Sequence, residues 1–135
     1  MTDKELVKAA SDASKNAYSP YSRFPVGAAL MLSDGTVITG CNVENASYGL
    51  TNCAERTAIF TAIASGRKDF VKMAIYASTD EFVSPCGACR QVMFEFAPEM
   101  TLLLSDRDLN SRVATVKELL PFGFGSTALP AKDNQ

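Results

Sequence analysis

The sequence predicts an α/β fold, a three-layer α-β-α sandwich around a mixed sheet of about five strands. Apolar residues at helical spacing alternate along the chain with short apolar runs typical of strands. The expected order is α-β-β-α-β-α-β with a short end, so some of the strands run parallel to one another. A length of 135 residues and an apolar fraction of 47% indicate one domain, residues 1–135.

The first elements are expected to be a helix and a hairpin. Thr2-Asp3-Lys4-Glu5 fits a capping box and predicts a helix from Asp3 to Ala17. Asp34-Gly35 is a strong turn signal, and it predicts a hairpin between the strands Val26–Ser33 and Thr36–Val43.

The middle of the chain is expected to contain two further helices. A polar loop, Glu44–Asn52, precedes a helix over Cys53–Ala64, for which Gly66 is the expected residue after the C-terminus. The strand Val71–Ala77 then leads to a helix over Pro85–Ala97, because proline suits the first helical position.

The last elements are expected to be short. Thr101–Leu104 is an apolar strand, and Val113–Ala114 can form a final one. Thr115-Val116-Lys117-Glu118 fits a second capping box that opens a brief helix. Residues 125–135 are expected to be a loosely held tail.

Charge and hydropathy exclude several classes of partner. Thirteen Lys and Arg against fifteen Asp and Glu give a net charge of −2, whereas a duplex-binding protein usually has a basic excess. We therefore expect no nucleic-acid partner and a small substrate without strong negative charge. No apolar run approaches the roughly 18 residues of a membrane span, so no membrane partner is expected. The charged start Met1–Leu6 lacks an apolar signal segment, so a cytoplasmic location and reduced cysteines are expected.

The chain contains no histidine. This excludes Ser-His-Asp and Cys-His nucleophile systems, and it excludes metal sites that use imidazole ligands. A bound metal must be held by Cys, Asp or Glu.

Three cysteines lie at the expected starts of two helices. Cys53 opens one helix, while Cys86 and Cys89 open another within Pro85-Cys86-Gly87-Ala88-Cys89. Helix N-termini favour thiolates, the form of cysteine that binds metals. Three thiolates can hold Zn²⁺ and leave the fourth tetrahedral position open, as in catalytic zinc sites.

Charged residues beside these cysteines fit the same chemistry. Glu55 lies two residues after Cys53, where its carboxylate can exchange protons with a water activated by zinc. Arg56 and Arg90 each lie close to a cysteine in sequence, and either can offset thiolate charge by donating to sulfur.

Two other interpretations of the cysteines stay open at this point. Cys41 could be the fourth ligand of a structural zinc site in a partner-binding module, although a single cysteine at a strand end is more often a small buried apolar residue. Cys86 and Cys89 could be the redox pair of a thiol–disulfide oxidoreductase, but that function explains neither Cys53 nor Glu55.

Cys53-Ala54-Glu55-Arg56 together with Pro85-Cys86-Gly87-Ala88-Cys89 resembles the signature of the cytidine deaminase family. The resemblance runs from about Tyr18 to Phe124, and it is greatest to the short, homotetrameric nucleoside deaminases with three cysteine ligands. It implies one Zn²⁺ per subunit, Glu55 as the catalytic residue and Arg56 as the group that compensates thiolate charge. The implied reaction is hydrolysis of cytidine and deoxycytidine to uridine and deoxyuridine with release of ammonia, a step of pyrimidine salvage.

The resemblance extends to the substrate side. Arg23–Ala28 looks like the family's pocket segment, which implies that Phe24 stacks on the pyrimidine; the alternative is that Phe24 is a core residue. Asn42–Tyr48 is similar to the ribose segment, which implies that Asn42 and Glu44 bind the 3′-hydroxyl.

The remaining implied contacts concern the base edge and neighbouring subunits. Ala54 would offer its backbone to the base, and Tyr48 and Phe124 would complete the pockets of neighbours in a homotetramer. Whether Phe122 or Phe124 is the closing aromatic stays open. Another cytosine compound, such as blasticidin S or single-stranded RNA, is the competing substrate, although the ribose-type segment disfavours the antibiotic and the acidic charge disfavours RNA.

Overall fold

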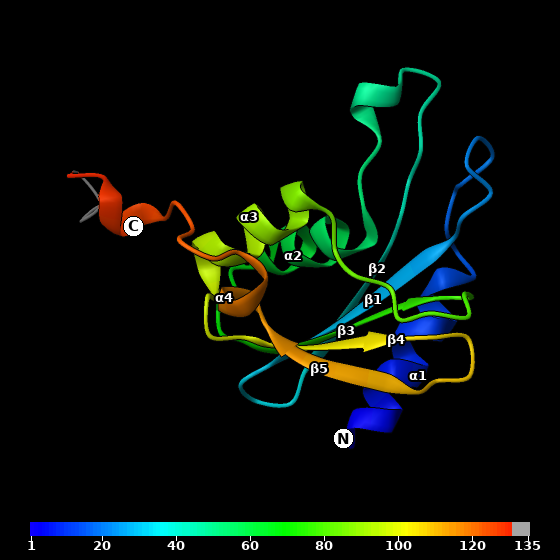
Figure 1. Cartoon of the computed structure of the whole chain (residues 1–135), viewed down its shortest axis with the longest axis horizontal. Helices are drawn as coiled ribbons and strands as arrows, with labels where there is room; N and C mark the ends of the chain where they lie inside the picture. Colours follow the sequence, from blue (N-terminus) through cyan, green and yellow to red (C-terminus); the bar gives the residue numbers. More distant parts are fainter. Residues whose placement is uncertain (131–135) are drawn as a thin grey trace.

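A computed structural model describes residues 1–130. It contains helices and strands in the expected order (Figure 1). The elements are α1 (Asp3–Ser14), β1 (Val26–Leu32), β2 (Val37–Cys41), η1 (Tyr48–Leu50), α2 (Ala54–Ala64), β3 (Phe70–Ala77), α3 (Gly87–Phe96), β4 (Thr101–Ser105), β5 (Ser111–Thr115), α4 (Val116–Leu119) and η2 (Ser126–Ala128).

The five strands form one mixed sheet with the order β2-β1-β3-β4-β5. Among the strand pairs within residues 1–130, only β3–β4 is parallel, and α3 lies in the crossover between these two strands. The other three pairs are antiparallel, including the β1–β2 hairpin, whose turn contains Gly35 at φ +88°. The expected mixed sheet is confirmed.

Alternate residues of the strands face two separate apolar layers. Leu30 and Met73 are paired in register and pack in the core that includes α2 and α3. Their neighbours Ala29 and Ala74 are also paired, and they pack against α1 on the opposite face. Figure 1 shows the resulting three layers, with α1 on one side of the sheet and α2 and α3 on the other.

Two glycines let the helices approach the sheet backbone closely. A Cβ at Gly27 would lie 1.9 Å from the Ala10 carbonyl oxygen of α1. A Cβ at Gly40 would lie 2.5 Å from both the Ala54 oxygen and the Ala58 nitrogen of α2. The depth at which α2 docks on β2 therefore depends on the absence of a side chain at Gly40.

Both capping boxes are confirmed, at Thr2 and at Thr115, but the first helix is three residues shorter than expected. It ends at Ser14, and the chain then turns so that the Tyr18 N–H donates to the Asn42 carbonyl at 3.0 Å. This pairing with a distant segment replaces the helical hydrogen bonds that periodicity alone predicted.

The third helix begins two residues later than expected. Cys86 is its N-cap, with extended backbone at φ −68° and ψ 168°, so Pro85 is not the first helical residue. The physical reason lies in Arg90, whose guanidinium bonds the Pro85 carbonyl and the Ser84 hydroxyl and holds both outside the helix.

The end of the chain contains more regular structure than expected. The last strand spans Ser111–Thr115 instead of two residues, and η2 lies within the segment that we expected to be loosely held. Residues 131–135 of that segment lie outside the described residues. Within residues 1–130, none of the helices has the length and apolar character needed to span a bilayer.

Candidate active site

The N-termini of α2 and α3 meet above one end of the sheet, and each begins at a cysteine. Cys53 is the N-cap of α2, Cys86 is the N-cap of α3, and Cys89 lies in the first turn of α3. Neither N-cap sulfur makes a capping hydrogen bond to its own helix. The sulfurs are therefore available to each other and to a metal, beside the partial positive charge of two helix ends.

The sulfur geometry fits a zinc ion. The Sγ atoms of Cys53, Cys86 and Cys89 all lie within 4.8 Å of one another, and those of Cys53 and Cys86 are 3.7 Å apart. Tetrahedral ligands with Zn–S bonds of about 2.3 Å have sulfurs about 3.8 Å apart. Cys41 lies on β2 opposite Gly27 and does not belong to this group.

Arg56 supplies positive charge to this cluster. Its Nη2 donates to the Cys53 Sγ at 3.3 Å. Hydrogen bonds from Cys89 and then from Arg56 lower the pKa of the Cys53 thiol to about 5, against the opposing effect of burial. The same contact with Cys53 raises the pKa of Arg56. Arg56 therefore lies where its guanidinium can offset thiolate charge, which is the role predicted for it or for Arg90.

Arg90 does not contact sulfur, although its place in the sequence allowed that role. Its guanidinium instead donates to the Pro85 carbonyl at 2.8 Å, to the Leu119 carbonyl at 2.9 Å and to the Ser84 hydroxyl at 2.9 Å. These three bonds tie the segment before Cys86 to the end of α4. Arg90 thus holds the backbone that presents a sulfur.

Glu55 lies in the first turn of α2, beside the sulfur cluster, and only 4% of its surface is exposed. Burial raises the pKa of its carboxyl group to about 7, and the negative charge of Cys53 acts in the same direction. A buried carboxyl group next to a metal site is suited to proton transfer.

A cleft of 390 Å³ opens beside the sulfurs and Glu55. Its volume lies within the range of small-molecule sites. The sequence-predicted residues on its wall are Phe24, Asn42, Glu44, Cys53, Ala54, Glu55 and Cys86. Residues from four separate segments of the chain therefore share one cavity with the candidate metal ligands.

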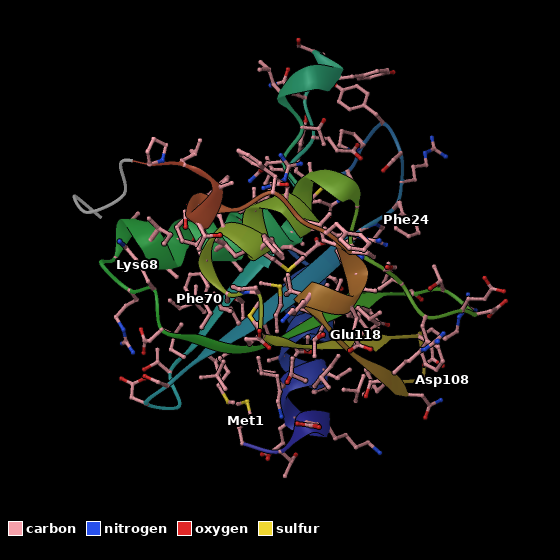
Figure 2. The ribbon with its side chains drawn as sticks, turned by 60° about the vertical axis from the view of Figure 1, so that its left-hand side comes forward. Met1, Phe24, Lys68, Phe70, Asp108 and Glu118 are labelled. Atoms are coloured by element: carbon pink, nitrogen blue, oxygen red, sulfur yellow. The ribbon has the colours of Figure 1, made fainter. Side chains whose placement is uncertain are left out.

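Phe24 stands at this cleft and not in the core. It is 42% exposed, and Figure 2 shows it near the point where the preceding loop enters β1. The Asn42 side chain holds this segment, because its Nδ2 donates to the Phe24 carbonyl at 2.9 Å and its Oδ1 accepts from the Val26 N–H at 2.8 Å.

Glu44 also lines the cleft and is buried, with 8% of its surface exposed. Its carboxylate accepts hydrogen bonds from the backbone N–H groups of Tyr21 and Ser22 and from the Ser22 hydroxyl. The hydroxyl contact is the main cause of a pKa below the usual range. Glu44 is therefore ionised at neutral pH and acts as an acceptor.

Tyr48 and Phe124 lie outside this cleft. Tyr48 is 75% exposed on η1 and touches the ring edge of Tyr21, with centroids 6.0 Å apart. Phe124 is 60% exposed, and its carbonyl accepts from the Gln91 side chain at 2.7 Å. Phe122 is fully exposed. Figure 1 shows the η1 loop and the C-terminal segment standing away from the sheet.

Comparison with known proteins identifies the family. The sequence model described as "Cytidine and deoxycytidylate deaminase zinc-binding region" matches residues 1–104. This chain belongs to the cytidine and deoxycytidylate deaminase family. The family's zinc-binding region and the Cys53, Cys86 and Cys89 cluster fit one zinc ion per subunit.

Individual members of the deaminase family resemble the chain over most of its length. A cytidine deaminase from Halalkalibacterium halodurans is 54% identical over 92% of this chain and 95% of the relative. The crystal structure of a cytidine deaminase from Burkholderia pseudomallei is 50% identical, with a TM-score of 0.89 over 92% of this chain and 100% of that one. A blasticidin-S deaminase from Bacillus cereus is 31% identical over 90% of this chain and 91% of the relative.

Sequence reasoning missed several residues of the site. Ser22, Thr51, Val83 and Ser84 also line the cleft, and none carried a motif of its own. For Ser22 the only available signal was its position two residues before Phe24. The contacts that give these residues a place in the site join segments far apart in the chain.

Proposed function

We propose that this protein deaminates cytidine and deoxycytidine hydrolytically, giving uridine and deoxyuridine with release of ammonia, as a step of pyrimidine salvage. The observation that carries the proposal is the group of three sulfurs at zinc spacing, placed with a buried Glu55 at the wall of a cleft of suitable size. An open ligand position beside a carboxylate is typical of a hydrolytic zinc enzyme.

The metal site uses three residues of this chain. Cys53, Cys86 and Cys89 would hold one Zn²⁺, and Arg56 would offset the charge of their thiolates through Cys53. When bound, zinc supplies a water of lowered pKa as the nucleophile. The free N-cap positions of two helices favour this thiolate-rich site.

Glu55 acts as the proton carrier of the reaction. Its carboxylate takes a proton from the attacking water and delivers it to N3 of the pyrimidine. It then passes the second proton to the departing amino group, so water and cytidine give uridine and ammonia. The position of Glu55 on the first turn of α2, in the same cleft wall as Cys53, supports this role.

The cleft binds the two halves of the nucleoside separately. Phe24 stacks on the base, and the backbone of Ala54 bonds its edge. Asn42 and Glu44 bind the 3′-hydroxyl of the sugar, for which a carboxylate acceptor is suited. All four residues line the same cleft.

A nucleoside suits this cleft better than a nucleotide. Within residues 1–130, the lining includes Glu44 and Glu55 but no Lys or Arg. A phosphate group would enter beside carboxylates without a cation to pair with it, which is unfavourable in a partly buried site.

The active assembly is a homotetramer in which Tyr48 and Phe124 complete pockets of neighbouring subunits. Both aromatics are largely exposed and lie outside the cleft of their own chain, which supports this role. Four free cysteines support a cytoplasmic location, because thiols persist in a reducing compartment. Light scattering at several concentrations measures the molar mass of the assembly. A monomer with full activity would contradict the homotetramer.

The decisive experiment measures activity and metal on the same sample. Loss of cytidine absorbance, with ammonia release and about one zinc per chain, is the expected result. Deoxycytidine should react, whereas deoxycytidylate and blasticidin S should react far more slowly. Full activity on blasticidin S without activity on cytidine would replace the proposed substrate.

A further inference from the structure

The Glu44 carboxylate is fixed almost entirely by the loop before β1. Its Oε1 accepts from the Tyr21 N–H at 2.9 Å and from the Ser22 N–H at 3.1 Å, while its Oε2 accepts from the Ser22 hydroxyl. Two of these three bonds come from one residue, Ser22, which lies 22 positions away in the sequence.

These bonds leave one acceptor position on the carboxylate. An ionised carboxylate offers about four lone-pair sites, two on each oxygen. Both sites of the Glu44 Oε1 are used, and one site of Oε2 is used by Ser22. The remaining site is on Oε2, beside the Ser22 hydroxyl, and both side chains line the cleft.

The Ser22 hydroxyl also connects Glu44, the proposed sugar-binding residue, to Phe24, the proposed base-stacking residue. While it donates to Glu44, its oxygen accepts from the Phe24 N–H at 3.1 Å. The Phe24 carbonyl is held in turn by Asn42 at 2.9 Å. Both backbone polar groups of the base-stacking residue are therefore bonded to side chains that line the cleft.

The backbone between Ser22 and Phe24 needs this support. Arg23 has φ +55°, a left-handed conformation that non-glycine residues seldom adopt. The Arg23 N–H donates to the Ser19 carbonyl at 2.9 Å. The hydroxyl of Ser22 bridges this strained residue, because it bonds the Phe24 N–H on the far side.

We propose that Ser22 is a specificity-determining positioning residue: it orients the Glu44 carboxylate so that its one free acceptor site selects a sugar hydroxyl that can donate. This inference rests on the proposed function, in which Glu44 accepts a hydrogen bond from the 3′-hydroxyl of the sugar. A sugar without that hydroxyl leaves the site of Glu44 unpaired in a partly buried position, which is costly. Without the hydroxyl of Ser22, the Glu44 carboxylate can rotate. It then distinguishes poorly between a sugar that has the 3′-hydroxyl and a sugar that lacks it.

The test compares cytidine with 3′-deoxycytidine in the zinc-loaded enzyme. The quantity measured is the ratio of kcat/KM values for the two substrates. Ser22→Ala is expected to lower this ratio about tenfold, because it removes a hydrogen bond to a charged group. The change should appear as a higher KM for cytidine, with kcat within about twofold of the wild-type value. Ser22→Thr keeps a hydroxyl and should restore most of the ratio.

The chain offers a matched control. Ser33 also donates its hydroxyl and its N–H to a carboxylate, that of Asp69, but neither residue lines the cleft. Ser33→Ala should leave the substrate ratio unchanged even if it lowers the melting temperature. If Ser22→Ala does not fold, Ser22→Cys, whose thiol is a weak donor, measures the same ratio.

Three results would overturn the inference. The first is a variant that folds, binds zinc and keeps the wild-type substrate ratio. The second is an equal loss on both substrates, which would make Ser22 a structural residue only. The third is wild-type enzyme that does not deaminate cytidine at all, which would also remove the proposed function and is recognised before any variant is made.

Discussion

The two ends of the cleft are built in different ways. At the metal end, Cys53 and Cys86 are the N-caps of helices that pack on the sheet, and Glu55 and Cys89, in the first turns of those helices, are buried. At the sugar end, Ser22 and Glu44 belong to loops that are joined mainly by hydrogen bonds between side chains and backbone. Figure 1 shows both loops projecting beyond the sheet.

This difference separates chemistry from substrate choice. The metal end takes its geometry from helices whose positions depend on core packing, so it tolerates little movement. The sugar end takes its geometry from a few hydrogen bonds, so single substitutions there should alter KM and specificity before they alter stability. Substitutions at the metal end should therefore have the largest effects on turnover and zinc content.

Glu55→Gln is expected to lower kcat by at least about 10²–10⁴-fold, because the amide cannot accept and return a proton. Zinc content and melting temperature should stay close to wild type, since the side chain keeps its shape. Steady-state kinetics, metal analysis and thermal melting measure these three quantities. Glu99→Gln on the exposed surface is the control. Near-normal turnover of Glu55→Gln would remove Glu55 from its assigned role.

Cys86→Ala is expected to lower zinc content and stability together, because metal binding is coupled to folding. A decrease in melting temperature on the order of 5–10 °C is expected for a chain of this size. Cys41→Ala is the matched control and should keep its zinc, since Cys41 is outside the sulfur group. Spectroscopy at the zinc absorption edge counts the sulfur ligands. Four sulfurs in the wild type and three in Cys41→Ala would instead favour a closed structural site.

Arg56→Gln is expected to weaken zinc binding or activity about 10–100-fold, because Arg56 donates to a ligand sulfur. Competition with a chelator measures the zinc affinity. Arg90→Gln is the informative partner, because its three bonds all go to oxygen atoms. It should lower the melting temperature more than Arg56→Gln does. Equal effects of both variants on both quantities would contradict the separate roles.

Gly40→Ala and Gly27→Ala are expected to destabilise the fold by about 1–3 kcal/mol each, through overpacking against a helix. Only Gly40→Ala pushes on α2, the helix that carries Cys53 and Glu55. It should therefore reduce kcat at temperatures where both variants remain folded. Denaturant unfolding and kinetics on the same samples separate the two effects, and equal kcat values would show that the metal end tolerates such a shift.

The sequence predicted the three metal ligands because each lies at the start of a predicted helix, and two of them, Cys86 and Cys89, share one short motif. Cys53 lies 33 positions before Cys86, and it was grouped with them only because it also begins a predicted helix. The sugar end was found through resemblance, and its supporting residue Ser22 was missed. Hydrogen bonds between Ser22 and Glu44 depend on how two loops meet, which no short motif records. The sequence left open whether Arg56 or Arg90 donates to sulfur, and it gave no sign of the bond from Arg90 to Leu119, 29 positions away.

The late start of α3 illustrates a related limit. Helix propensity and the proline rule placed the start at Pro85, and the structure places it at Gly87. The Arg90 side chain bonds the Pro85 carbonyl five positions before it, a contact that helix propensity and the proline rule do not include. The late start makes Cys86 an N-cap, whose sulfur is freer to face a metal than it would be inside the helix.

The all-thiol character of the metal cluster carries a cost for a cell. Thiolates are soft ligands that favour soft metal ions. The cluster contains only thiolates and the chain has no histidine, so no imidazole ligand adds selectivity for zinc over softer ions. Cadmium, mercury and cuprous ions compete strongly for such sites. Exposure to these heavy metals would therefore poison this enzyme early, and its activity would depend on the buffering capacity of cellular chelators.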